Sequence, residues 1–308
     1  MDGQNPTMRY TRFGALGWKV SRLSIGTVEF GIPYGFVGHG ESAVPERADA
    51  KDLLLAAFDS GINLVDTSPT YGPAEEIVGE ALKEWSGSEI FVAGKLPTWG
   101  QAAAESVERT LSRLRRDHLD LLQIYSRSDD WEAVRRALDV GRKCRDEGKT
   151  RALGITFYDE TIGLAAAEVA DLQVVQLPYN VLDRRMASRL IPRARARGMA
   201  IWGRSALLKG ILTGRRRENP THLATLVREA ERLATRSEKR GLSIASAALR
   251  FCLSDPGIDS VLLGVRNREE LRSALEALYR GDELDWMRSH TFLGDSALLD
   301  PRTWDTPH

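Results

Sequence analysis

Short apolar runs alternate with longer amphipathic stretches along most of the chain. The runs are typical of buried parallel strands, whereas the intervening stretches repeat apolar residues at helical spacing, as at Leu53, Leu54 and Ala57. Eight strands with helices between them are what a closed barrel requires. The pattern therefore predicts an α/β fold, a (β/α)8 TIM barrel, with strands at residues 23–27, 62–66, 90–95, 119–125, 152–156, 172–177, 200–204 and 260–264.

Two segments depart from this alternation. Apolar runs at 8–13 and 18–23 flank a glycine-rich segment, which predicts an N-terminal β-hairpin that closes the barrel floor. Between the seventh and eighth strands lie two helical patterns, at 223–240 and 244–253, where a single crossover needs only one.

The C-terminal tail, residues 281–308, is expected to be irregular. It contains Trp286, Met287, Phe292 and Trp304, and these apolar side chains predict packing back onto the barrel rather than disorder. We expect one domain, 1–308, with the barrel core at about 21–280.

Charge and cysteine content narrow the function classes. The 43 basic and 43 acidic residues balance, which gives no bulk attraction to nucleic acid or to a membrane surface. We interpret the most basic run, residues 214–217, as a solvated loop. No apolar stretch is long enough to span a bilayer, and the polar N-terminus lacks a signal-peptide core. Cys144 and Cys252 indicate neither a disulfide framework nor a zinc site, so we expect a soluble, cytoplasmic protein without a metal.

Ionisable side chains follow three successive predicted strands. Asp66 ends the second strand and is followed by a small-residue loop and Tyr71, Lys95 ends the third, and Tyr125 ends the fourth. The carboxyl ends of parallel strands share one edge of a barrel, where active sites are assembled. The sequence therefore predicts a catalytic site built from these side chains.

These residues and several ordered motifs resemble the aldo-keto reductases from about residue 10 to residue 278. The strongest match is the segment 66–72 with Glu75, followed by Gly94, Lys95 and the stretch 121–129. Weaker matches follow in the same order, at 154–156, 175–180, 205–214 and 263–266.

The resemblance implies hydride transfer between NADPH and a carbonyl on a small polar or sugar-like substrate. Tyr71 would be the general acid, with Lys95 close enough to favour the ionised phenol and Asp66 holding the ammonium group. The family usually has a histidine at the position of Tyr125. A phenol donates one hydrogen bond but forms no cation near neutral pH, so carbonyl polarisation would change.

The cofactor positions implied by the resemblance are mixed. Gln176 matches a residue that binds the nicotinamide amide and Thr156 can replace a serine, but Phe157 stands where an asparagine is expected, so one amide contact would be lost. Arg204 replaces a tyrosine that stacks on the nicotinamide. The further cofactor positions are Gly26, Thr27, Ser205, Leu207, Gly210 and Gly264.

The choice between NADP and NAD depends on two residues near the eighth strand. Arg266 is placed for the adenosine 2′-phosphate, whereas the carboxylate of Glu270 repels a phosphate and can accept from a ribose hydroxyl. We expect NADP as the cofactor, with a weakened preference that leaves NAD possible.

Several alternatives stay open. The scaffold could perform an elimination or isomerisation with Tyr71 as base, or could bind nucleotide without turnover. Arg127 and Arg204 could recognise an anionic substrate, or either could pair with Asp129 or another carboxylate. We expect a pocket lined by Trp99, Tyr125, Arg127 and the tail aromatics.

Neither the histidines nor the oligomeric state narrows the function classes further. His39 lies in a loop on the expected catalytic face and could supply an imidazole or be incidental, whereas His118 precedes the fourth strand and is expected on the opposite face. The sequence does not specify an oligomeric state.

Overall fold

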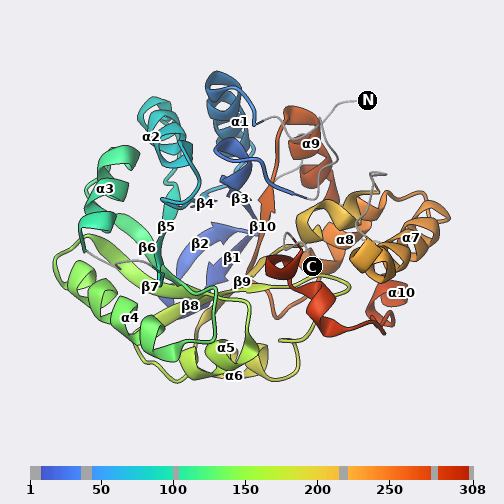
Figure 1. The fold of residues 1–308 in the computed structure, drawn as a ribbon. Coiled ribbons are helices and arrows are strands. Elements are labelled where there is room, and N and C mark those ends of the chain that lie inside the picture. The colour runs from blue at the N-terminus through green and yellow to red at the C-terminus, as the bar shows by residue number, and fades with distance from the viewer. Residues whose placement is uncertain (1–7, 36–43, 100–103, 215–220, 279–283, 305–308) are drawn as a thin grey trace.

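In the computed structural model, which describes residues 8–35, 44–99, 104–214, 221–278 and 284–304, eight parallel strands close into a barrel (Figure 1). Each strand pairs with its neighbour in the chain, and the last strand closes the ring against the first. The predicted (β/α)8 fold is confirmed. The strands are β3 Leu23–Gly26, β4 Leu64–Asp66, β5 Phe91–Pro97, β6 Leu119–Tyr125, β7 Thr150–Thr156, β8 Leu172–Pro178, β9 Ala200–Arg204 and β10 Ser260–Gly264.

The second predicted strand begins two residues later than expected, at Leu64. The reason is Asn63, whose side chain accepts a hydrogen bond from the Ser21 amide at 2.8 Å and donates to the Lys19 carbonyl at 2.8 Å. Asn63 therefore joins the barrel to the N-terminal hairpin.

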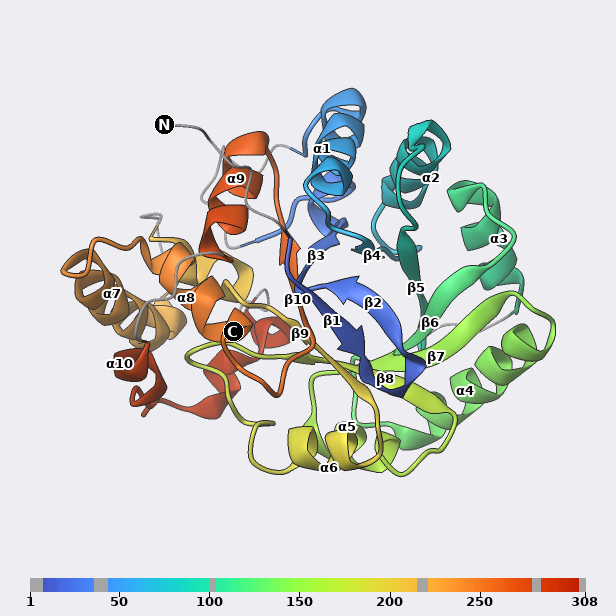
Figure 2. The same ribbon diagram turned by 180° about the vertical axis from the view of Figure 1, so that it is seen from behind.

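Helices form a ring outside the barrel in both views (Figures 1 and 2). Asp130, Asp159, Ser243 and Asn267 cap four of them by accepting a backbone N–H, as N-cap side chains do. The two helical patterns expected after β9 are confirmed as α7 and α8. The helices are α1 Arg47–Asp59, α2 Ala74–Glu84, α3 Ala104–Leu114, α4 Trp131–Asp146, α5 Glu160–Ala166, α6 Leu190–Ala196, α7 Ala224–Glu238, α8 Ile244–Leu253, α9 Arg268–Ala277 and α10 Asp285–Arg288.

The N-terminal hairpin plugs the amino end of the barrel. Strands β1 Tyr10–Phe13 and β2 Trp18–Ser21 pair in antiparallel fashion around the short helix η1 Gly14–Leu16. The Phe13 ring meets Trp202 edge-on at 6.0 Å between centroids, and Trp18 stacks on Phe91 at 5.0 Å. The predicted closure of the barrel floor is confirmed.

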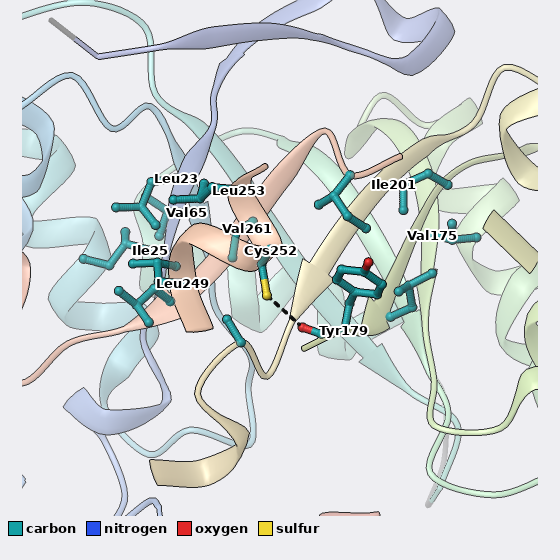
Figure 3. Close-up of a cluster of buried hydrophobic side chains, with 14 of the residues drawn as sticks. Leu23, Ile25, Val65, Val175, Tyr179, Ile201, Leu249, Cys252, Leu253 and Val261 are labelled. Carbon is teal, nitrogen blue, oxygen red and sulfur yellow. Dashed lines mark hydrogen bonds between the residues drawn. The ribbon is translucent and has the colours of Figure 1, made fainter. Parts of the chain in front are cut away.

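Along each strand, side chains alternate between two hydrophobic cores, one inside the barrel and one between the strands and the helices. Leu64, Leu121 and Trp202 belong to a cluster inside the barrel together with the hairpin. Their neighbours in the chain point outward to the helices, as strand geometry requires. Figure 3 shows this outer core, in which Val65 and Ile201 belong to one cluster with the side chains of α8.

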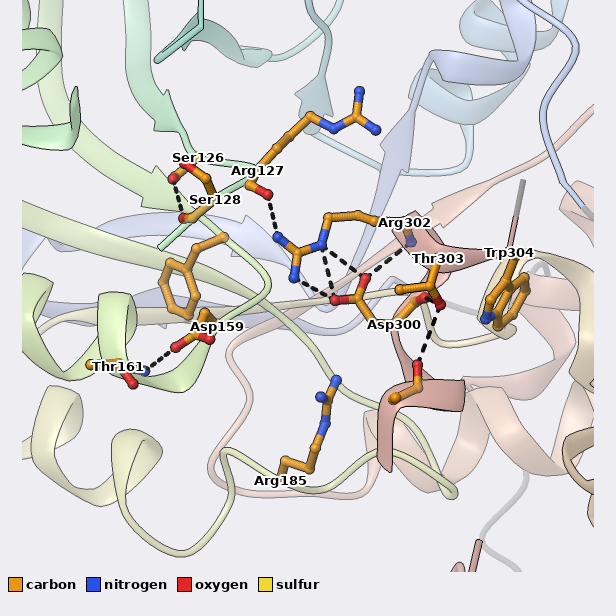
Figure 4. A network of polar contacts seen from close by, with 12 residues as sticks. Ser126, Arg127, Ser128, Asp159, Thr161, Arg185, Asp300, Arg302, Thr303 and Trp304 are labelled. Atoms are coloured by element: carbon orange, nitrogen blue, oxygen red, sulfur yellow. Dashed lines mark hydrogen bonds and ion pairs between the residues drawn. The ribbon is translucent and has the colours of Figure 1, made fainter. Parts of the chain in front are cut away.

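The described part of the tail packs back onto the barrel, as the apolar residues predict. Met287, Leu299 and Trp304 are buried. Arg302, in the short helix η6 Pro301–Thr303, pairs with Asp300 and donates to the Arg127 carbonyl (Figure 4). The tail thereby reaches the loop after β6, at the carboxyl end of the barrel.

Candidate active site

One cavity of about 980 Å³ opens at the carboxyl ends of the strands. Every residue that the sequence assigned to catalysis or cofactor binding lines it, and the helix N-termini of α8 and α9 border it as well. The assigned residues are Asp66, Tyr71, Lys95, Tyr125, Gly26, Thr27, Thr156, Gln176, Arg204, Ser205, Leu207, Gly210, Gly264, Arg266 and Glu270.

Strand periodicity explains why the strand residues of this set converge. Asp66 follows the inward-facing Leu64 by two residues, and Lys95 follows the inward-facing Ala93 by two. Gln176 stands in the same relation to Val174. A step of two residues keeps a side chain on the same face, so a polar layer lies directly above the apolar core of the barrel.

Asp66 is the centre of this polar layer. Its side chain forms a buried ion pair with Lys95, and the two residues are 2% and 4% exposed. The other carboxylate oxygen, Oδ1, accepts from the amides of Gln123 at 2.8 Å and Gln176 at 2.9 Å. Buried charges persist when they are paired and hydrogen-bonded, and this carboxylate is both.

Tyr71 lies beside this pair, with Lys95 Nζ 4.9 Å from its ring centroid. Its loop needs a glycine opposite, because a Cβ on Gly31 would lie 1.7 Å from the Tyr71 carbonyl oxygen. Burial raises the pKa of Tyr71 well above its ordinary value, the Asp66 carboxylate adds to that rise, and Arg204 opposes it.

This direction differs from the expectation that Lys95 would favour the ionised phenol. Lys95 lies where predicted, but its ammonium group is engaged by Asp66, and burial dominates. The phenol is therefore held in its protonated form near neutral pH.

Tyrosines and a guanidinium group form the opposite wall. Burial raises the pKa of Tyr125, and its ring meets Trp99 edge-on at 4.8 Å. Arg204 lies over the Tyr158 ring, with Cζ 4.1 Å from the centroid, and donates to Thr156 Oγ1 at 3.3 Å.

Arg204 also donates to the Phe157 carbonyl at 2.6 Å. The Phe157 side chain is fully buried among core residues and contributes no polar group to the cavity. Among the described residues, neither Arg204 nor Arg127 forms an ion pair, so the proposed pairing of either with Asp129 is not seen.

One guanidinium nitrogen of Arg266 is already bonded to a carboxylate. Its guanidinium pairs with Glu270 at 2.8 Å, and its backbone N–H donates to the same carboxylate at 2.9 Å. A 2′-phosphate bound at this guanidinium group would lie beside the Glu270 carboxylate, which would repel it.

The cavity fits a dinucleotide on three counts. Its volume is at the upper end of the range for ligand sites. The N-termini of α8 and α9, each a helix of 10 residues, offer positive dipole ends to phosphates. Left-handed backbone at Ser205 (φ 61°) and Gly210 (φ 94°) shapes the loop after β9 along one wall.

Four cavity or second-layer residues were missed by the sequence interpretation: Gln123, Glu29, Tyr34 and Tyr158. Gln123 precedes Tyr125 by two residues, so strand periodicity alone could have placed it inside. No periodic pattern marks the other three, because Tyr34 and Tyr158 lie in loops and Glu29 lies in the three-residue helix η2 Val28–Phe30. Burial raises the pKa of Glu29 to about 7.

The pocket lining was partly mistaken. Trp99 and Arg127 do line the cavity, but the described tail contributes Pro301 and Arg302 instead of the aromatic side chains. Trp304 packs inward, because its ring is buried in the core. His118 precedes β6 and lies at the other end of that strand from the cavity.

His39 and residues 215–217 lie outside the described residues. Among the described residues, no cluster of three or more histidine, cysteine or acidic side chains could hold a metal ion. Cys144 and Cys252 form no disulfide and are buried. The described helices include none that is long and apolar enough to cross a membrane.

The structure is a closed (β/α)8 barrel with Asp66 and Lys95 on adjacent strands at its carboxyl end and Tyr71 in the loop after β4. The chain belongs to the aldo/keto reductase family, whose model matches residues 22–288.

Similar proteins include the aldo-keto reductase YhdN of Bacillus subtilis (strain 168), 28% identical over 302 residues, with 87% of this chain and 88% of that protein covered. The NADH-specific methylglyoxal reductase of Escherichia coli (strain K12) is 26% identical, covering 88% and 94%. A probable voltage-gated potassium channel subunit beta of Oryza sativa subsp. japonica is 28% identical, covering 88% and 91%.

Proposed function

We propose that this chain is an NAD(P)(H)-dependent oxidoreductase that interconverts a carbonyl and an alcohol on a small polar or sugar-like substrate. The observation that carries the proposal is the buried Asp66–Lys95 pair beside Tyr71, in the same cavity as the residues assigned to the cofactor. Free, buried cysteines support the proposal that it works in the cytoplasm.

In this proposal, Tyr71 gives its proton to the alkoxide that forms from the carbonyl. The raised pKa keeps that proton in place until negative charge develops on the substrate. Arg204, which lowers the pKa of Tyr71, and Lys95 beside the ring then stabilise the phenolate left behind. Tyr125 donates a hydrogen bond to the same substrate oxygen and orients it.

A reduced nicotinamide, when bound, would supply the hydride. Gln176 and Thr156 would hold its amide, and Arg204 would contact the ring. The backbone and side chains at Gly26, Thr27, Ser205, Leu207, Gly210 and Gly264 would surround the rest. We propose that NADP is the cofactor and that NAD is also accepted, because Glu270 already neutralises Arg266.

Two measurements test the proposal. Titration of NADPH and NADH, followed by quenching of tryptophan fluorescence, should show saturable binding, and no binding of either at millimolar concentration would contradict it. Small aldehydes, methylglyoxal among them, should be reduced with stoichiometric NADPH consumption. Tyr71→Phe should lower kcat by roughly 100-fold or more while the Kd for NADPH changes little.

A non-catalytic nucleotide-binding protein is the second candidate. The observation that favours it is the similarity to a protein named as a channel subunit, since that name is not an enzyme's. It predicts NADPH binding without turnover, and the same residual rate in wild type and in Tyr71→Phe.

A further inference from the structure

Glu29 lines the cavity but has no part in the function proposed above. It lies in the short helix η2 just after β3, next to Phe30, which is buried in the outer core. Strands β3 and β10 pair with Gly26 opposite Gly264, so the chain that leaves β3 lies beside the end of β10. The Glu29 side chain packs there against Gly264, where a Cβ would overlap both carboxyl oxygens.

This carboxyl group lacks the partners that would hold a negative charge. Oε2 is buried without a hydrogen-bond partner among the described residues, which leaves Oε1 as the oxygen that can meet a ligand. Arg266, the cation that acts on Glu29, is bonded to Glu270. A buried carboxylate oxygen without a donor costs free energy, and a carboxylic acid avoids most of that cost. The geometry therefore favours a protonated Glu29.

The charged and titratable groups around Glu29 agree with this assignment. Burial raises the pKa of Glu29 to about 7, Glu270 of α9 adds to the rise, and Arg266 opposes it. Burial also raises the pKa of Tyr34 and of Tyr71 well above the ordinary value, so both phenols are uncharged near neutral pH. Among the described residues, no histidine lines the cavity. Glu29 thus carries its proton at pH 6 and has largely lost it at pH 8 in the ligand-free protein.

The part of the cavity beside Glu29 suits a phosphate group. Asn267, the N-cap of α9, follows Gly264 by three residues, and the positive end of this helix borders the cavity. A carboxylate at this place would repel a phosphate, whereas a carboxylic acid can donate a hydrogen bond to one of its oxygens. A hydrogen bond to an ionised acceptor is stronger than one between neutral groups.

We propose that Glu29 is a cofactor-binding residue whose protonated carboxyl group donates a hydrogen bond, through Oε1, to a phosphate oxygen of the bound dinucleotide. The inference rests on the proposed function in taking a dinucleotide as the ligand, and it requires no turnover. The bound phosphate stabilises the acid and repels the carboxylate, so it raises the pKa of Glu29 further. Binding therefore takes up a proton, and affinity is full below pH 7 and falls as pH rises above it.

Binding of NADH and of ADP-ribose tests the inference. Neither ligand carries a phosphate monoester, which would itself titrate with a pKa of about 6. Isothermal titration calorimetry at pH 7.5, in two buffers with different enthalpies of ionisation, measures the protons taken up. Wild type should take up roughly 0.7 proton per ligand, because a carboxyl group with a pKa of about 7 is mostly ionised at that pH. Its Kd for either ligand should rise roughly tenfold between pH 6 and pH 8.

Two substitutions at Glu29 separate a donated hydrogen bond from an effect of charge alone. Glu29→Gln keeps an N–H donor but has no proton to take up, so its Kd should not depend on pH and should be roughly tenfold lower than that of wild type at pH 8. Glu29→Leu has no donor, so its Kd at pH 6 should be roughly tenfold higher than that of wild type. The matched control Glu269→Gln changes an exposed carboxyl group that also lines the cavity, and it should retain the proton uptake of wild type.

Several outcomes overturn the inference. Proton release on binding, with a Kd that falls as pH rises, would mean that an ionised Glu29 accepts from a ribose hydroxyl instead. Binding without proton exchange, uptake that persists in Glu29→Gln, equal affinity of the Gln and Leu variants at pH 6, or no binding of ADP-ribose also overturns it. Near-ultraviolet circular dichroism establishes that each variant is folded. Absence of carbonyl reduction by wild type contradicts the proposed function instead, and the ADP-ribose titration still decides the inference.

Discussion

At the scale of single residues, the carboxylates of Asp66 and Glu29 differ in the free energy that it costs to keep them ionised at the cavity. Asp66 is buried but has an ion pair and two amide donors. Glu29 lines the same cavity, and its oxygen Oε2 is buried without a hydrogen-bond partner among the described residues. Burial raises the pKa of Glu29 to about 7, and Glu270 adds to this while Arg266 opposes it. The two carboxylates differ most in their partners, because Asp66 has three and Glu29 Oε2 has none among the described residues.

Glu29 should therefore make stability depend on pH. Its carboxyl has a higher pKa in the folded chain than in the unfolded chain, so the folded state binds more protons between about pH 4.5 and 7, and stability falls across that window as pH rises. Glu29→Gln should remove this loss, which is at most about 3 kcal/mol at pH 8. Urea unfolding at pH 5 and pH 8 measures it.

A control for this effect is Glu132→Gln, at an exposed ion pair with Arg135 on α4. It should change stability by less than about 1 kcal/mol at either pH. If Glu29→Gln and wild type lose the same stability between pH 5 and pH 8, the carboxyl of Glu29 is not the group that titrates.

At the level of elements, α9 supplies one partner, Glu270, of the charge pair that bears on cofactor choice. Asn267 caps the helix by accepting from the Glu270 amide at 2.9 Å, which places Glu270 in the first turn. The Glu270 side chain forms an ion pair with Arg266, four residues earlier. A carboxylate in the first turn also stabilises the helix dipole, so the same residue serves the helix and weakens a phosphate site.

Glu270→Gln should raise affinity for NADPH relative to NADH by roughly tenfold, because it frees the Arg266 guanidinium and removes a repelling charge. Fluorescence titration of both cofactors measures the ratio of Kd values. The matched control is Glu276→Gln, which breaks a pair with Arg272 at the same spacing on the exposed side of the helix. An equal ratio in Glu270→Gln and wild type would show that Glu270 does not set the preference.

At the scale of the whole molecule, the residues that stabilise the barrel floor and the residues of the cavity lie at opposite ends of the barrel. The hairpin and the apolar interior layer occupy the amino end, whereas the polar layer and the cavity occupy the carboxyl end. Phe13 is fully buried against Trp202 and is not part of the cavity. The two ends should thus respond independently to mutation.

Phe13→Ala should lower the free energy of unfolding by about 3–5 kcal/mol, since it leaves a void at the barrel floor. The Kd for NADPH should remain within twofold of wild type at a temperature where the variant is folded. Calorimetry and fluorescence titration measure the two quantities. A large loss of cofactor affinity in a folded variant would mean that the floor and the cavity are coupled.

Local patterns in the sequence determined the strands, the helices, the hairpin and the residues at the strand ends. This was possible because strand and helix periodicities are local and because parallel strands share one carboxyl edge. Periodicity also fixes which residues face inward, and Gln123 could have been found that way.

Only the tertiary structure determined which ionisable side chains have a partner and which protonation state burial favours. Asp66 engages Lys95, and burial raises the pKa of Tyr71. Tyr158 and Arg302 reach the cavity from a loop and from the tail, where no periodic pattern applies. Charge states depend on burial and on partners far apart in the chain, and these exist only once the barrel has closed.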